Sequence, residues 1–263
     1  MKKYLVIGNP IEHSLSPKLH NYWIKKNNIN AVYDKKKINE NEIKYLISEI
    51  KNKKISGINV TVPFKNSVIP FVDKLSSEAD QSQSVNTIYL KENKIIGHNT
   101  DIAGFELAVR HFNYDIKNKI VFILGAGGVV SSIILSLNKM KVSKIIISNR
   151  TKKRTENLKN LFKNIDVVEW GEIPRFDIII NATSLGLKEE DEIKIDYSNI
   201  GSNKFFYDVI YNPKQTNFLK KAKNLGNKTE NGMMMFIYQA HQAFTIWHKL
   251  MPDIDEETIK LLD

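Results

Sequence analysis

A glycine-rich turn follows an apolar strand in the second half of the chain. Residues 120–124 are all apolar, and the sequence Gly-Ala-Gly-Gly-Val-Val at 125–130 leads into helical periodicity at 129–140. The first glycine permits a tight turn, and Gly127 lets the backbone approach a pyrophosphate at the helix N-terminus. Val130 is bulkier than the small residue expected third in this pattern. The turn predicts a dinucleotide site formed by Gly125, Ala126, Gly127, Gly128 and Val129.

The residues after the next strand bear on the choice of nucleotide. The strand at 144–148 is followed by Asn-Arg-Thr-Lys-Lys-Arg at 149–154. This stretch lacks the carboxylate that binds the ribose of NAD, whereas Arg150 can pair with a 2′-phosphate. Cations at a helix N-terminus oppose the helix dipole, and a bound phosphate would offset that cost. The pattern favours NADP, while a plain turn and a solvated helix start are the alternatives for each motif alone.

Four polar segments in the first half of the chain could together bind a small, oxygen-rich anion. Residues 13–17 place two serine hydroxyls beside a helix start, and residues 59–65 read Asn-Val-Thr-Val-Pro-Phe-Lys. Ser-Val-Asn-Thr at 84–87 and Gly-His-Asn-Thr-Asp at 97–101 add amides, hydroxyls and one carboxylate. Taken singly, these segments fit a helix cap, an edge strand with an exposed lysine, and turns. Only their combination predicts a binding site.

Alternating strands and helices must position these groups. Apolar runs of strand length stand at 4–7, 58–62, 120–124, 144–148, 176–180 and 205–210, and helical patterns at 17–26, 43–50, 129–140, 152–163 and 233–250. Ser16 is expected to cap the first helix, and Asp255 a closing helix at 256–262. Such alternation implies a parallel sheet covered on both faces. We predict two α/β domains with a cleft between them, the second a Rossmann-type doubly wound parallel sheet.

Composition limits the classes to which the protein can belong. The 263 residues suffice for two modest domains, and the absence of cysteine excludes disulfides and thiolate chemistry. The net charge of +10 comes from scattered lysines, so a solvated surface fits better than a nucleic-acid partner. The histidines lack metal-ligand spacing, and no metal is expected. No apolar run reaches the roughly 18 residues that span a bilayer, and the start reads as a strand, so we expect a cytoplasmic protein without a membrane partner.

The order of short motifs along the chain resembles one family. SLSP, NVTVPFK, SVNT, NTD-x-x-G, GAGG, NRT, NAT-x-x-G, DVIYNP-x-x-T and QA-x-x-x-F follow one another between Ile7 and about His248. This order is similar to that of the shikimate dehydrogenase family, with NVTVPFK and NTD-x-x-G as its most specific elements. The resemblance covers nearly the whole chain. It implies reversible, NADPH-dependent reduction of 3-dehydroshikimate to shikimate, in the chorismate pathway of aromatic amino acid biosynthesis.

The resemblance also implies roles for individual residues. Lys65 and Asp101 match the family's catalytic pair. The substrate carboxylate would be bound by Ser14 and Ser16, and the ring hydroxyls by Thr61, Asn86 and Gln239, with Tyr211 beside the ring. The adenosine phosphate of NADP would be held by Asn149, Arg150, Thr151 and Arg154, and the nicotinamide would lie beside Val209 and Gly232. Residues 1–101 and 233–263 would form the substrate-binding catalytic domain and residues 102–232 the NADP-binding Rossmann domain, with a homodimer as the assembly considered.

Hydride transfer to a ketone needs a proton donor at the oxygen. Lys65 is the candidate acid for the C3 oxygen and the candidate base in the reverse direction, and Asp101 would orient its ammonium. The chain departs from the family at Ser82-Gln83-Ser84, where small apolar residues and glycine are usual. It also departs at Ser77, where many members carry an acidic residue. Both departures leave the catalytic pair intact.

Three other functions are weighed against this reading. A quinate/shikimate dehydrogenase with broader substrate and cofactor use would carry the same pair, although Arg150 argues against NAD preference. A non-catalytic NADP-binding sensor would be expected to lose Lys65 or Asp101. An RNA-binding protein is suggested by the net charge alone.

Overall fold

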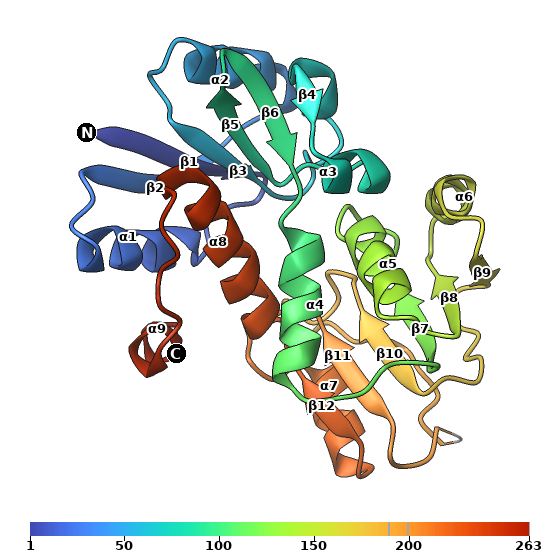
Figure 1. The fold of residues 1–263 in the computed structure, drawn as a ribbon. Helices are drawn as coiled ribbons and strands as arrows, with labels where there is room; N and C mark the ends of the chain where they lie inside the picture. Colours follow the sequence, from blue (N-terminus) through green and yellow to red (C-terminus); the bar gives the residue numbers. More distant parts are fainter. Residues whose placement is uncertain (189, 199, 263) are drawn as a thin grey trace. The chain divides into compact units, whose positions relative to one another are not determined.

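Two six-stranded sheets organise the chain, which we describe from a computed structural model of residues 1–188, 190–198 and 200–262 (Figure 1). The first unit comprises Met1–Gly104 and Ile237–Asp263, and the second Phe105–Phe236. The boundaries fall inside helices α4 (Asp101–His111) and α8 (Met233–His248). The functional division predicted from the sequence, at 101/102 and 232/233, stays a prediction.

The sheet of the first unit is mixed, with the strand order β2-β1-β3-β5-β6-β4. Its strands are β1 (Lys2–Gly8), β2 (Ala31–Lys37), β3 (Gly57–Val60), β4 (Lys74–Leu75), β5 (Thr87–Lys91) and β6 (Lys94–His98). β5 runs antiparallel to both β3 and β6. The expectation of a parallel sheet fails in this half only at β5, because β1 pairs in parallel with β2 and β3, and β4 with β6. The cause is a hairpin whose two turn residues, Glu92 and Asn93, have φ of 49° and 64°, the backbone that tight hairpins require.

Helices α1 (Ser16–Lys26), α2 (Ile43–Lys51) and α3 (Ser77–Ser82) pack on strands of the first sheet, and α9 (Glu256–Leu261) packs on α1. Short 3₁₀ turns stand at Glu40–Glu42 and Ile69–Phe71. The helical pattern predicted at 43–50 is confirmed, because its apolar residues join the core with Leu5, Ile58 and Ile88 of the sheet; they are Ile43, Leu46, Ile47 and Ile50. The other face is aromatic: Tyr4 stacks on Trp247 of α8, and Tyr33 on His20 of α1.

The caps of two helices were predicted. Asp255 caps α9 as expected, its side chain accepting from the Thr258 amide. The prediction that Ser16 caps α1 is wrong by one residue, because Leu15 occupies the cap position and Ser16 begins the helix. The hydroxyl that reaches a free amide at this end belongs to Ser14, whose Oγ accepts from the Ser16 N–H at 3.3 Å.

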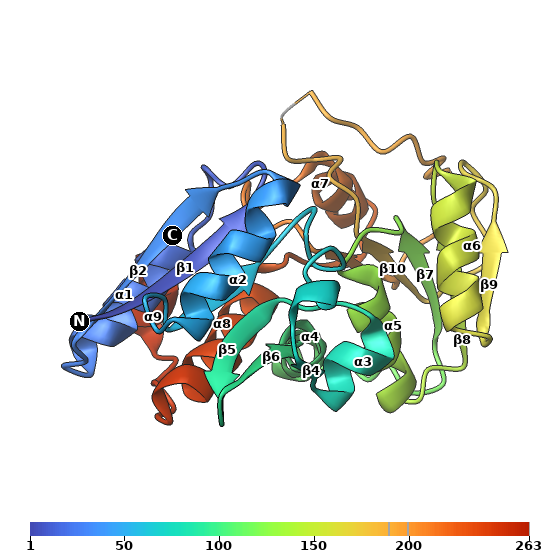
Figure 2. The same cartoon turned by 90° about the horizontal axis from the view of Figure 1, so that it is seen from above.

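The second sheet has six parallel strands in the order β12-β11-β10-β7-β8-β9. Figure 2 shows β10, β7, β8 and β9 from above. The strands are β7 (Ile120–Leu124), β8 (Lys144–Ser148), β9 (Ile165–Val168), β10 (Ile178–Asn181), β11 (Phe205–Asp208) and β12 (Lys228–Glu230). The helices are α5 (Val130–Lys139), α6 (Lys152–Leu161) and α7 (Asn217–Asn224). This order is that of a Rossmann sheet, with its switch point between β7 and β10. Two α/β units, the second with a Rossmann-type doubly wound parallel sheet, are therefore confirmed.

Within the described residues, no helix is long and apolar enough to cross a membrane.

Candidate functional site

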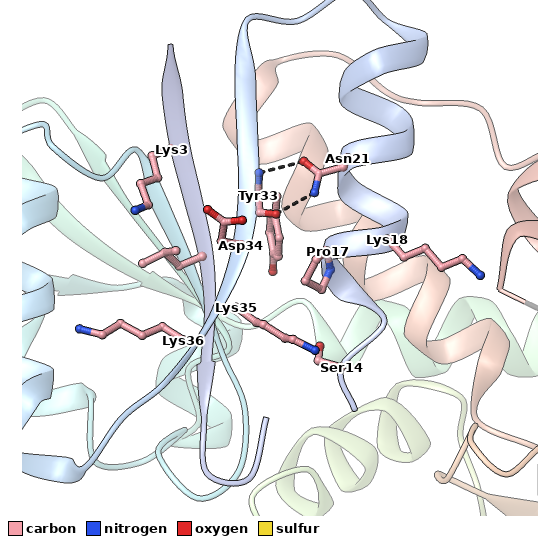
Figure 3. A pocket seen from close by; sticks show the side chains of 10 residues that line it. Lys3, Ser14, Pro17, Lys18, Asn21, Tyr33, Asp34, Lys35 and Lys36 are labelled. Carbon is pink, nitrogen blue, oxygen red and sulfur yellow. Dashed lines mark hydrogen bonds between the residues drawn. The ribbon is translucent and has the colours of Figure 1, made fainter. Parts of the chain in front are cut away.

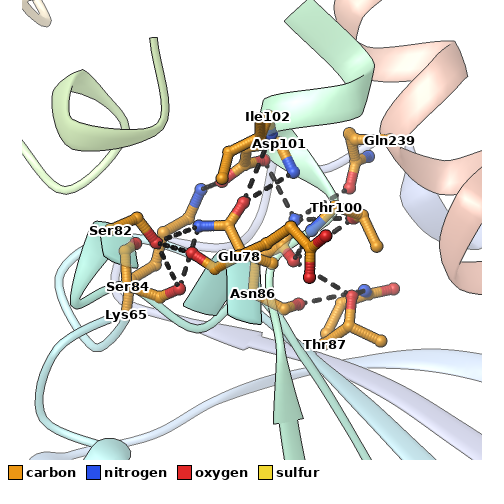
Figure 4. Close-up of polar contacts among 12 residues, drawn as sticks. Lys65, Glu78, Ser82, Ser84, Asn86, Thr87, Thr100, Asp101, Ile102 and Gln239 are labelled. Atoms are coloured by element: carbon orange, nitrogen blue, oxygen red, sulfur yellow. Dashed lines mark hydrogen bonds and ion pairs between the residues drawn. The ribbon is translucent and has the colours of Figure 1, made fainter. Parts of the chain in front are cut away.

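Lys65 and Asp101 form a buried ion pair in the first unit (Figure 4). The Lys65 Nζ lies 2.5 Å from the Asp101 Oδ2, and the side chains are 10% and 6% exposed. Asp101 is the first residue of α4, and the Asn99 Oδ1 accepts from its backbone N–H at 3.0 Å and from that of Ile102 at 3.3 Å. A buried ammonium requires a compensating partner, and the carboxylate supplies it. The pair is therefore held in place from both ends.

The backbone around Lys65 explains why this side chain is buried. Phe64 and Val68 belong to the apolar core, so burial of these two side chains holds the turn after β3 against the sheet. The Lys65 carbonyl accepts from the Val85 N–H at 2.8 Å. β3 lies between β1 and β5. The plainer reading of this segment, an edge strand with an exposed lysine, is wrong.

Amide side chains surround the ion pair. The Asn86 Nδ2 lies 2.9 Å from the Asp101 Oδ1 and 3.5 Å from the Gln239 Oε1 of α8. The structure thus brings four of the predicted residues into one cluster, namely Lys65, Asn86, Asp101 and Gln239. Figure 4 shows their polar ends directed toward one another. The cluster joins a proton donor to acceptors and donors suited to hydroxyl groups.

The other predicted substrate residues of this unit lie outside that hydrogen-bonded cluster. Thr61 directly follows β3, where its backbone N–H donates to the Ile7 carbonyl at 2.9 Å. Ser14 and Ser16 lie at the start of α1. Among the described residues, no hydrogen bond joins these three side chains to the ion pair or to Asn86.

A hollow of about 570 Å³ lies beside β2 and α1 (Figure 3). Of the predicted substrate residues, only Ser14 lines it, and Lys65 and Asp101 do not. Its lining includes four lysines, namely Lys3, Lys18, Lys35 and Lys36. The hollow is therefore rich in cations, and its lining does not include the ion pair.

The glycine turn of the second unit has the geometry that the sequence predicts. Gly125 has φ of +111°, and a Cβ there would lie 2.7 Å from the Ala182 carbonyl oxygen. Next to Gly127 such an atom would meet nothing closer than 4.0 Å. No side chain caps α5, which begins at Val130. The turn stands at the ends of β7 and β10 and leads into the N-terminus of α5, the end of a helix that favours a phosphate.

The segment after β8 presents cations. Arg150 and Arg154 are exposed, and no carboxylate of the described residues lies within ion-pair distance of either. Lys152 is paired with Glu169 at 2.9 Å, and its pKa is raised mainly by that hydrogen bond. The Asn149 Nδ2 donates to the Thr151 carbonyl at 2.9 Å, which shapes the turn. The two arginines are thus available to a phosphate.

Val209 and Gly232 meet in the second unit. A Cβ on Gly232 would lie 2.1 Å from the Val209 carbonyl oxygen, so only glycine fits there. The Gly232 N–H donates to the Ile210 carbonyl at 3.1 Å. Tyr211 follows and stacks on Phe236, with ring centroids 4.6 Å apart.

A buried carboxylate beneath this loop was missed by the sequence reasoning. The Asp208 Oδ1 accepts from the Ile210 N–H and from the Asn181 Nδ2, each at 3.0 Å, and the Oδ2 accepts from the Thr216 hydroxyl at 2.7 Å. Burial raises the pKa of Asp208 to about 6, although these hydrogen bonds act to lower it. An aspartate within an otherwise buried strand was the signal that could have found it. Asn59 and Thr87 belong to polar segments that the sequence singled out, but no individual role was predicted for either; both are buried.

Family models cover most of the chain. Residues 6–88 match the shikimate dehydrogenase substrate binding domain, and residues 106–209 match the family described as shikimate / quinate 5-dehydrogenase.

Individual relatives agree with these matches. A curated shikimate dehydrogenase (NADP(+)) from Pelagibacter ubique is 61% identical over 262 residues, which cover 100% of this chain and 99% of that protein. The crystal structure of the Aquifex aeolicus shikimate dehydrogenase matches with a TM-score of 0.91 at 36% identity, covering 99% of this chain and 98% of that one. A Thermus thermophilus shikimate 5-dehydrogenase in complex with NADP(H) and shikimate matches with a TM-score of 0.89 at 27% identity, covering 100% and 97%. On this identity over its full length, the chain belongs to the shikimate dehydrogenase family.

Proposed function

We propose that the protein acts as an NADP-dependent shikimate dehydrogenase, which reversibly reduces 3-dehydroshikimate to shikimate. The observation that carries this conclusion is the buried Lys65–Asp101 pair, 2.5 Å apart, in a chain with a Rossmann sheet. The reaction places the protein in chorismate and aromatic amino acid biosynthesis.

The chemistry assigned to the first unit is proton transfer. Lys65 gives a proton to the C3 oxygen as the ketone becomes an alcohol and takes it back in the reverse reaction. Asp101 holds the ammonium and accepts from a neighbouring ring hydroxyl. The substrate carboxylate is assigned to Ser14 and Ser16, and the remaining hydroxyl contacts to Thr61, Asn86, Gln239 and Tyr211. The support is the serine hydroxyls at the start of α1 and the amides around the pair.

The second unit is assigned to NADP, which when bound supplies or accepts the hydride. The pyrophosphate would be held by residues 125–129, where a Cβ-free Gly127 leaves room and the amides of α5 are not capped by a side chain. The 2′-phosphate end is assigned to Asn149, Arg150, Thr151 and Arg154, and the nicotinamide to Val209 and Gly232. Two exposed arginines without a carboxylate partner among the described residues fit a phosphate.

The test is a spectrophotometric assay of shikimate with NADP at alkaline pH, read at 340 nm. Quinate in place of shikimate, and NAD in place of NADP, are the controls for a broader enzyme. We expect Lys65→Ala to lower turnover by ~10²–10⁴-fold, with a smaller effect on substrate affinity. Turnover of Lys65→Ala near that of the wild-type protein would refute the assignment.

Two further proposals concern location and assembly. NADPH-dependent biosynthesis supports a cytoplasmic location, which cell fractionation would test. A homodimer is supported by the free edge of β2, which pairs only with β1 among the described strands. Lysines at 35–37 on that strand would repel a second copy, so association should increase with salt. A monomer by sedimentation velocity at every salt concentration would contradict the dimer.

A further inference from the structure

Asp101 is held on both of its oxygens by buried groups. Its Oδ2 lies 2.5 Å from the Lys65 Nζ, and its Oδ1 accepts from the Asn86 Nδ2 at 2.9 Å. The Asn86 amide has one possible orientation, because the backbone N–H of Thr100 can only donate and lies 2.8 Å from the Asn86 Oδ1. The Asn86 nitrogen must therefore face the carboxylate.

Asn59 donates to the backbone of Asn86, and the orientation of its amide is fixed in the same way. Its Nδ2 lies 3.0 Å from the backbone carbonyl of Asn86, which can only accept. Its Oδ1 must then face Tyr33, whose hydroxyl donates to it at 2.7 Å. The remaining proton of the Asn59 Nδ2 is directed to the Thr87 Oγ1, 3.0 Å away.

Thr87 joins the two amides. Because its oxygen accepts from Asn59, its single proton goes to the Asn86 Oδ1 at 3.1 Å. Four hydrogen bonds thus run in one direction, from Tyr33 through Asn59, Thr87 and Asn86 to Asp101; we call them the Tyr33 chain. Its members before Asp101 are at most 7% exposed. In a low-dielectric interior, aligned hydrogen bonds polarise one another, so the far end affects the near end.

We propose that Tyr33, Asn59 and Thr87 are positioning residues for the reaction, because the Tyr33 chain orients the Asn86 amide on Asp101 and so holds the Lys65 ammonium. This inference rests on the proposed function and adds to it. The main role of Asn86 is then to orient Asp101, since its two amide protons already have acceptors in the Asp101 Oδ1 and the Thr100 Oγ1, each 2.9 Å away. Binding of a ring hydroxyl is its secondary role.

Two substitutions remove one hydroxyl each and little else. Tyr33→Phe keeps the ring that stacks on His20 at 4.1 Å and 5°, and Thr87→Val keeps the shape of the side chain. We expect Tyr33→Phe to lower kcat about 3- to 10-fold, the effect of one lost hydrogen bond. Thr87→Val, which is closer to Asp101, should lower kcat more, and the KM for NADP should stay unchanged in both. The acidic limb of the pH–rate profile should move in both.

A matched control and a rescue accompany these variants. Tyr4→Phe removes another buried hydroxyl from the same aromatic face, where Tyr4 stacks on Trp247 at 4.8 Å. Tyr4 is not part of the Tyr33 chain, so kcat and the pH–rate profile should remain those of the wild-type protein. Thr87→Ser restores a hydroxyl at the same position and should recover most of the activity lost in Thr87→Val.

A double variant tests whether the effect passes through Asp101. In an Asp101→Asn background, Tyr33→Phe should change the residual rate little, because the group on which the chain acts is gone. The same fold-loss in both backgrounds would overturn the inference, as would wild-type kcat and pH profile in both Tyr33→Phe and Thr87→Val. Absence of turnover in the wild-type protein would instead refute the proposed function, so the two failures are distinguishable.

Discussion

A buried histidine makes the stability of the first unit depend on pH. His20 is 1% exposed, and neither of its ring nitrogens has a hydrogen-bond partner among the described residues. Burial, with a smaller contribution from His248, lowers the pKa of His20 from 6.5 to about 3. The folded protein therefore keeps the ring neutral, while the unfolded chain takes up a proton below pH 6.5. The stabilisation that comes from keeping His20 neutral is fully present above pH 6.5 and is lost as the pH falls toward 3.

His20→Phe removes this titration and keeps the ring stacked on Tyr33. A pKa difference of one unit corresponds to about 1.4 kcal/mol, and the unfolded histidine is already half protonated at pH 6.5. Between pH 6.5 and 4.5 the wild-type protein should therefore lose about 2 kcal/mol that the variant retains. At pH 7 the variant should be at least as stable, because no hydrogen bond is lost. Four aromatic rings, those of Trp23, Tyr33, Phe244 and Trp247, pack around His20 and exclude water from it.

Urea unfolding followed by tryptophan fluorescence measures this difference. The chain has three tryptophans, so a Trp170→Phe background leaves Trp23 and Trp247, which both report on the first unit. His13→Phe is the control, since His13 is exposed, and its pH dependence should follow that of the wild-type protein. Parallel stability curves for His20→Phe and wild-type protein from pH 6.5 to 4.5 would refute the reasoning.

Three more predictions follow from single positions. Arg150→Ala should raise the KM for NADP about 10-fold or more and leave that for NAD nearly unchanged, because only the 2′-phosphate uses this charge; equal effects in steady-state kinetics would contradict it. Burial raises the pKa of Asp208 from 3.8 to about 6, which costs the folded state about 2 kcal/mol as the pH rises from 4 to 7. Asp208→Asn should therefore gain stability relative to the wild-type protein over that range, and a pH-independent difference in urea midpoints would exclude this. Gln83 has φ of 47°, so Gln83→Gly should stabilise the protein by ~0.5–1 kcal/mol despite losing a hydrogen bond to Asp80, and a lower melting temperature would argue against strain.

Much of the second unit is predictable from the sequence because its signals are local. The strands at 120–124 and 144–148 have the predicted bounds, and the glycine turn follows the first of them. A parallel strand buried on both faces appears as a continuous apolar run, and helix periodicity separates one run from the next. α5 and α6 are one to two residues shorter than predicted at their ends, where the backbone leaves the helix before the pattern does.

The cluster around Asp101 is less predictable, because it depends on pairing between distant strands. Asn59 lies opposite Thr87 in the antiparallel β3–β5 pair, and Thr87 lies opposite His98 in β5–β6. The first pairing lets the Asn59 amide reach Thr87. The second aligns β6 with β5, so that Asp101, which follows β6 in the sequence, lies beside Asn86. The motifs identify the polar segments. Glu92 and Asn93, however, lack the Asn-Gly or Asp-Gly pattern that would predict the hairpin aligning those segments.

The alternation of polar and apolar residues in β3 has a consequence for catalysis. Because side chains alternate across a sheet, Ile58 and Val60 pack with α2 in the apolar core, while Asn59 belongs to the opposite, aromatic face with Tyr33. A slip of one residue in the register would bury Asn59 among the isoleucines of α2 and turn Val60 toward Tyr33. The apolar core on one face therefore fixes the register that places a hydrogen-bonded chain on the other. Large-to-small substitutions such as Ile58→Ala should thus lower turnover as well as stability, although this side chain touches no group of the ion pair.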